Sequence, residues 1–164
     1  MYQIGDYVVY GNKGVCEVKQ IAPMEMSGIS NGKMYYTLVP IYREESKIYT
    51  PVDHNKTSMR SVISKEDAFQ LMHDLEEIKP LEIENEKNLE QVYKDCMNSF
   101  NCKDMMKVIK TIYVRQSTRI LDGKKLIATD EKYLKIAKEC LIGELSIPLK
   151  KTPKDLEEEI RERL

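Results

Sequence analysis

The spacing of apolar residues changes at Ser64, and this change constrains the fold more than any other feature of the chain. Before Ser64, apolar and aromatic side chains alternate over short runs separated by glycine-containing turns, a pattern typical of β-strands. After Ser64, apolar residues recur every three or four positions, as they do on one face of an amphipathic helix. The sequence therefore predicts an α+β chain of two domains, with the boundary near Ser64.

The first domain, residues 1–63, is expected to be a small Tudor-like or SH3-like β-barrel. Several short strands joined by tight turns in about sixty residues are typical of such barrels or of a strongly bent sheet. Pro40 interrupts the longest strand, and proline cannot donate a hydrogen bond to a neighbouring strand, so we expect that stretch to be an edge strand or to contain a bulge. The predicted strands are 5–10, 15–21, 33–42, 47–51 and 60–63.

The second domain, residues 64–150, is expected to be an all-α bundle of four to five short helices. Ser64 is a typical N-cap of the first helix, and Thr129 is expected to cap the fourth. Residues 151–164 are predicted to form a short acidic terminal helix, because Thr152 is followed by a proline that suits the first turn. Apolar stripes at helical spacing, such as Leu89, Tyr93 and Met97, predict the buried faces.

Charge is unevenly distributed along the chain, whose net charge is −1. Residues 66–95 contain 3 basic and 10 acidic residues, whereas residues 103–135 contain 9 basic and 4 acidic ones. A basic block in an otherwise acidic chain is typical of a surface that contacts a phosphate backbone. The alternative is that these lysines are only the solvated faces of helices.

Enzymes, metal proteins and membrane proteins find no support in the sequence. It contains no G-x-S-x-G, H-E-x-x-H or P-loop motif, so we expect neither an enzyme nor a bound cofactor. The cysteines form no C-x-x-C pair and the histidines lie far from them, so no metal site is predicted. We expect a cytoplasmic protein, because there is no signal peptide and no run of about eighteen apolar residues.

Five segments resemble a known family. They are YQIGDYVVYGNKGV at 2–15, YYTLVPI at 35–41, IYTPVDHN at 48–55, RSVISKE at 60–66 and LIGEL at 141–145. In this order they resemble the CarD/CdnL family of bacterial transcription regulators. The N-terminal domain of that family is similar to the polymerase-interacting module of the transcription-repair coupling factor. The resemblance implies a Tudor-like domain followed by a helical domain.

The resemblance also implies the partners. In the family, the β-domain binds the β subunit of RNA polymerase by pairing an edge strand, and the helical domain contacts promoter DNA and stabilises the open complex. The equivalent edge here would be residues 33–42 together with 47–51. The residues expected to bind polymerase are Tyr35, Thr37, Val39, Tyr49 and Pro51.

This chain departs from the family pattern in one respect. Well-known members insert a tryptophan into the minor groove, but this chain has no tryptophan, and the aligned position falls close to Glu86. A carboxylate there would be repelled by phosphates, so DNA contact is expected to rest on basic side chains and on the start of the helix near Thr129. The residues expected to bind DNA, without reading its sequence, are Lys87, Lys107, Lys110, Arg115, Arg119, Lys124, Lys125, Thr129, Lys132 and Lys135. The alternative hypothesis is an adaptor that binds polymerase and does not touch DNA.

Overall fold

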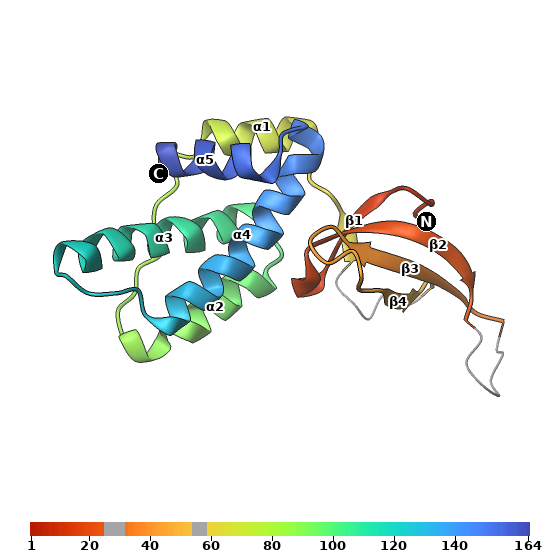
Figure 1. Cartoon of the computed structure of the whole chain (residues 1–164), viewed down its shortest axis with the longest axis horizontal. Coiled ribbons are helices and arrows are strands. Elements are labelled where there is room, and N and C mark those ends of the chain that lie inside the picture. Colours follow the sequence, from red (N-terminus) through yellow and green to blue (C-terminus); the bar gives the residue numbers. More distant parts are fainter. Residues whose placement is uncertain (25–31, 54–58) are drawn as a thin grey trace. The chain divides into compact units, whose positions relative to one another are not determined.

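A computed structural model describes residues 1–24, 32–53 and 59–164, and it divides the chain into two compact units, Met1–Val62 and Ile63–Leu164 (Figure 1). The first unit contains the described strands and the second contains the α-helices, which confirms the α+β prediction. Among the described residues, no helix combines the length and the apolar character needed to cross a membrane.

The first unit is an antiparallel five-stranded sheet with strand order β4-β3-β2-β1-β5. One face carries its small core, formed by Val8, Cys16, Val18, Tyr36 and Leu38. The barrel prediction is not confirmed: β4 and β5 stand at opposite edges, and no pairing among the described residues closes the sheet. The strands are β1 (Tyr7–Tyr10), β2 (Val15–Pro23), β3 (Met34–Pro40), β4 (Ile48–Pro51) and β5 (Met59–Ser61).

Pro40 does not make its strand an edge, which corrects the expectation for residues 33–42. Strand β3 lies inside the sheet, between β2 and β4, and the only irregularity in its described pairing lies in β2, between Val18 and Gln20. The N–H of Ile41 bonds to the Val15 carbonyl, so the backbone nitrogen of Pro40 faces the β4 side. Because β4 begins at Ile48, opposite Leu38, the missing N–H costs no ladder bond there.

The second unit is organised around α4, which contacts α1, α2, α3 and α5. One core cluster joins all five α-helices, and Leu156 and Ile160 of α5 are buried in it, so residues 151–164 pack as part of this unit. Figure 1 shows α3 and α4 as the longest helices; at 20 and 22 residues they are longer than the short helices expected. The elements are α1 (Lys65–His73), the 3-10 turn η2 (Glu86–Asn88), α2 (Leu89–Asn98), α3 (Cys102–Leu121), α4 (Ala128–Leu149) and α5 (Pro153–Arg163).

One of the two predicted helix caps is confirmed: the Ser64 side chain accepts a hydrogen bond from the Asp67 N–H. The terminal helix starts where it was predicted, and the Thr152 side chain caps it by accepting a hydrogen bond from the Asp155 N–H. The cap predicted at Thr129 is wrong: α4 begins at Ala128, its N-cap position is Ile127, and no side chain caps it. Thr129 therefore lies within the first turn, where its hydroxyl cannot serve as the N-cap acceptor.

Candidate functional sites

The five residues predicted to bind polymerase lie on one face of the N-terminal sheet. Tyr35 pairs with Pro51 and Thr37 with Tyr49 across β3 and β4, so these side chains project from the same face. Val39 follows on the same face of β3, because side chains alternate along a strand. Tyr36 and Leu38 point the other way, into the core.

A shallow depression of about 310 Å³ lies on this outward face. Tyr35, Thr37 and Tyr49 form one side of it, and β2 contributes Gln20 and Ala22. The β2 residues were missed by sequence reasoning, since only the pairing of β2 with β3 shows that they belong to the same face. The Tyr49 side chain is about half exposed, as an interface residue must be before its partner binds.

Strand β4 is one of the two edges of the sheet: β3 pairs with one side of β4, and no described strand pairs with the other side. The Val52 N–H bonds to the Met34 carbonyl, and ladder bonds alternate along an antiparallel pair, so Thr50 also faces β3. The backbone groups of Tyr49 and Pro51 therefore point away from the sheet. Since proline has no N–H, Tyr49 supplies the N–H donor that this part of the edge offers to an added strand.

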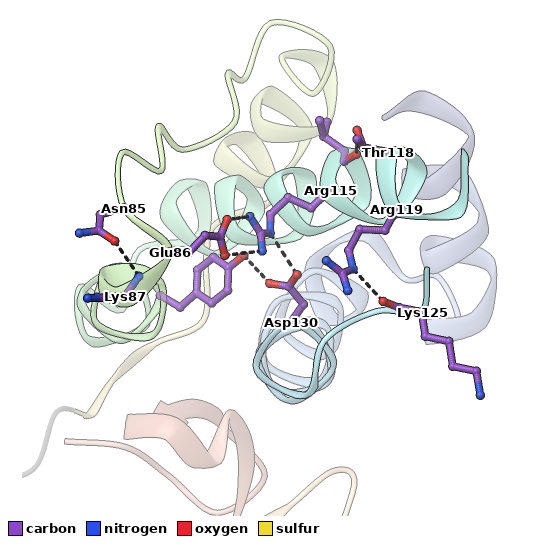
Figure 2. Close-up of polar contacts among 10 residues, drawn as sticks. Asn85, Glu86, Lys87, Arg115, Thr118, Arg119, Lys125 and Asp130 are labelled. Carbon is purple, nitrogen blue, oxygen red and sulfur yellow. Dashed lines mark hydrogen bonds and ion pairs between the residues drawn. The ribbon is translucent and has the colours of Figure 1, made fainter. Parts of the chain in front are cut away.

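In the helical unit, Arg115 stands between two carboxylates from distant elements (Figure 2). Its Nε donates to Asp130 Oδ2 at 3.0 Å, and Nη1 and Nη2 donate to the two Glu86 oxygens at 2.6 and 3.0 Å. Tyr93 donates its hydroxyl to Asp130 Oδ1 at 2.7 Å. Asp130 is fully buried. The four residues come from η2, α2, α3 and the first turn of α4, so their hydrogen bonds join these elements.

The electrostatics of the cluster follow from these contacts. Hydrogen bonds from Arg115 lower the pKa of the Glu86 carboxyl, and those to Glu86 and Asp130 raise the pKa of Arg115 despite its partial burial. Burial, together with the bond to Asp130, raises the pKa of Tyr93. Arg115 is thus committed to internal partners and is poorly placed to meet a phosphate. Sequence reasoning missed this cluster because its hydrogen-bonded partners are 15 to 37 residues apart along the chain.

Three more of the residues predicted to bind DNA also make internal contacts. Lys110 donates to the carbonyls of Leu75 and Glu76, which follow the end of α1, at 3.1 Å each. Lys107 pairs with a carboxylate one turn earlier on α3. Arg119 donates to the Lys125 carbonyl at 2.7 Å and so holds the loop between α3 and α4 (Figure 2).

The remaining basic residues come from η2, from the loop between α3 and α4, and from the first turns of α4. Lys132 is exposed and pairs loosely with Glu90 at 3.5 Å. The other four are exposed, and within the described parts of the chain none has a carboxylate at ion-pair distance: Lys87, Lys124, Lys125 and Lys135. We call the set Lys87, Lys124, Lys125, Lys132 and Lys135 the basic end of the helical unit. Lys107 does not belong to this set, because it lies eight residues before Arg115, about 12 Å along the α3 axis.

Comparison with known families identifies the N-terminal unit. Residues 2–63 match the family model described as the CarD-like/TRCF RID domain. The match covers nearly all of the unit Met1–Val62 and none of the α-helices. No curated protein shows a significant match to the chain.

Proposed function

Since residues 2–63 make its N-terminal unit a CarD-like/TRCF RID domain, an RNA-polymerase-interacting module of the CarD-like family, we propose that this protein is a bacterial, cytoplasmic transcription regulator. It binds the β subunit of RNA polymerase through that unit and stabilises promoter open complexes through its helical unit. The family match over residues 2–63 is the observation that carries this proposal.

The edge of β4 supports polymerase binding by strand addition. The backbone groups of Tyr49 and Pro51 point outward and have no strand beside them among the described residues. An added strand would bond to this edge, and its side chains would meet the depression between Tyr35 and Tyr49. Backbone bonds supply affinity in this mode, and the side-chain depression supplies specificity.

The basic end of the helical unit supports contact with the DNA backbone. Its exposed lysines come from η2, the loop between α3 and α4, and α4 itself, and the Arg115 cluster holds these elements together. Glu86, close to the position aligned with the family's tryptophan, is paired with Arg115, which reduces the repulsion that its carboxylate would exert on a phosphate. Flexible lysines contact phosphates without reading bases, so binding should depend on salt and hardly on sequence.

The decisive experiment is the lifetime of the open complex on a ribosomal-type promoter, with cognate polymerase, with and without this protein. We expect a longer lifetime in its presence. An unchanged lifetime, measured where co-elution shows the protein bound to polymerase, would overturn open-complex stabilisation while leaving polymerase binding in place.

A second function is favoured by the internal contacts of Lys107, Lys110, Arg115 and Arg119. With these side chains engaged, the protein could act as an adaptor that binds polymerase and does not touch DNA. Reversing the charge of Lys124 and Lys125 separates the two functions. An adaptor would retain its full effect on transcription, whereas a DNA-contacting regulator would lose most of it.

A further inference from the structure

The connection between the two units of the chain is very short. Ser61, the last residue of β5, pairs with Val8 of β1, and Ile63 is the first residue of the helical unit. The side chain of Ile63 packs against the core of that unit, and Ser64 caps α1 directly after it. Val62 alone therefore separates a residue that is held by the sheet from a residue that is held by the helical unit.

The backbone of Ile63 takes its hydrogen-bond partner from a distant helix. Strand β5 ends at Ser61 and α1 begins at Lys65, so neither the sheet ladder nor the helix supplies an acceptor for the Ile63 N–H. Glu144 of α4 supplies it, with Oε1 at 2.8 Å from the Ile63 nitrogen. The other carboxylate oxygen, Oε2, accepts a hydrogen bond at 3.3 Å from the thiol of Cys102, the first residue of α3. One side chain of α4 thus holds the point at which the chain enters the helical unit.

The chemistry of Glu144 fits an anchor better than a packing residue. Glu144 is 1% exposed, and burying a carboxylate costs free energy that hydrogen bonds must offset. Packing alone would be served by an apolar side chain of similar size, which could not accept a hydrogen bond. Hydrogen bonds to an ionised group are roughly twice as strong as bonds between neutral groups, so the carboxylate holds the Ile63 N–H more firmly than a neutral acceptor would.

From these contacts we infer that Glu144 is a positioning residue, which anchors the chain at Ile63 and confines the link between the two units to Val62. Each residue released from the anchor would add up to about 3.5 Å of reach to the link. A link of one residue keeps the helical unit close to whatever the N-terminal unit binds, and so keeps its effective concentration there high. This consequence rests on the proposed function, in which the N-terminal unit binds polymerase and the helical unit acts on promoter DNA.

Distances between spin labels on the two units test the anchor in the full chain, without polymerase. The labels would replace Glu45 and Asn98, exposed residues of different units, and would be carried by unnatural amino acids because the chain has four cysteines. Double electron–electron resonance measures the width of the distance distribution. Glu144→Met keeps the side-chain volume but removes the acceptor, so we expect a distribution at least about 1.5 times as wide as that of the wild type. Glu144→Gln keeps an acceptor oxygen and should retain most of the wild-type width.

An insertion keeps the test decisive if Glu144→Met fails to fold. Gly-Ser-Gly-Ser placed after Val62 adds up to about 14 Å of reach and leaves the contacts of Glu144 in place. It should widen the distribution more than Glu144→Met does, while the urea unfolding of the helical unit stays unchanged. Equal widths for the wild type and Glu144→Met, or a wild-type distribution as wide as that of the insertion variant, would overturn the inference.

The lifetime of the open complex separates this inference from the proposed function. The insertion variant should still co-elute with polymerase, because its N-terminal unit is unchanged, but it should extend the lifetime by at most about half as much as the wild type does. A full extension by the insertion variant would overturn the role of the short link and leave the proposed function standing. If the wild type neither binds polymerase nor changes the lifetime, the proposed function fails, whereas the label distances still decide whether Glu144 anchors Ile63.

Discussion

Arg115 and Glu86, 29 residues apart in the sequence, form a two-bonded ion pair whose N–O distances are 2.6 and 3.0 Å. The same guanidinium also holds the buried carboxylate of Asp130. One side chain from α3 therefore ties η2 to the first turn of α4. Arg115 was expected from the sequence to bind DNA. In the structure it instead holds together the elements that carry the exposed lysines.

Replacing Arg115 with methionine should destabilise the helical unit. The carboxylate of Asp130, which is fully buried, would keep the Tyr93 hydroxyl but lose its cation. Removing one partner of a buried ion pair costs about 3 kcal/mol or more, and we expect a loss near that value in urea unfolding followed by helical circular dichroism. The control Lys125→Met removes an exposed cation and should change stability by less than about 0.5 kcal/mol. Equal effects of the two variants would refute the structural role of Arg115.

The contribution of Glu86 should depend on pH. Hydrogen bonds from Arg115 lower the pKa of Glu86 below its usual 4.5. A carboxyl whose pKa falls on folding stabilises the folded state above its unfolded pKa, and this stabilisation is lost as the pH falls through the folded pKa. The free energy of unfolding of the wild type should therefore exceed that of Glu86→Gln at neutral pH, and the two should converge below pH 4.5. A difference that does not vary with pH would contradict this assignment.

Replacing Tyr49 with proline should weaken polymerase binding. The N–H of Tyr49 points to the outer side of β4, so its removal leaves the ladder with β3 intact while deleting a donor for the added strand. We expect at least about a tenfold rise in the Kd for the polymerase β subunit, measured by biolayer interferometry. Tyr49→Phe keeps the N–H and the ring and is the control. If phenylalanine weakens binding as much as proline does, the tyrosine hydroxyl and not the strand edge carries the contact.

Removing the charges of Lys124 and Lys125 together should reduce the salt dependence of DNA binding. Each phosphate contact contributes about 0.9 to the slope of log K against log salt concentration, so the double alanine variant should lose about 2 from that slope. The slope would be measured on the polymerase–promoter complex over a salt series. Lys107→Ala is the matched control, because Lys107 already pairs with Asp104 at 3.5 Å. A larger loss from the control would place the DNA contact on α3 and not on the loop that follows it.

Lys110 should matter for stability and not for DNA. Its ammonium group bonds to two carbonyls just beyond the end of α1, where a cation is favoured by the helix dipole. Lys110→Met should lower the free energy of unfolding by about 1 kcal/mol and leave the salt slope unchanged. Lys103→Met, at an exposed position in the first turn of α3, should change neither the free energy of unfolding nor the salt slope. A reduced slope for Lys110→Met without any loss of stability would reverse this assignment.

Local patterns in the sequence predicted the elements well. The spacing of apolar residues changes at Ser64 and can be seen directly in the sequence. The caps at Ser64 and Thr152 each bond to an N–H three residues further on, so they depend only on neighbours along the chain. The failure at Thr129 has the same local scale, because the N-cap of α4 is Ile127, only two residues before the predicted position. Helix boundaries shift by one or two residues at little cost.

The place of each element in the fold was decided by tertiary structure. The sequence alone shows that Pro40 lacks an N–H, but only the order of the strands shows that this gap faces a side where β4 has not yet begun. Likewise, the sequence alone determines that residues 103–135 carry an excess of positive charge. Which of those charges remain available depends on carboxylates and carbonyls brought from distant positions, such as Glu86 to Arg115. Ion pairing falls off over a few ångströms in space and does not depend on separation along the chain, so only the folded structure could divide the lysines of the basic end from the cations that hold the helices together.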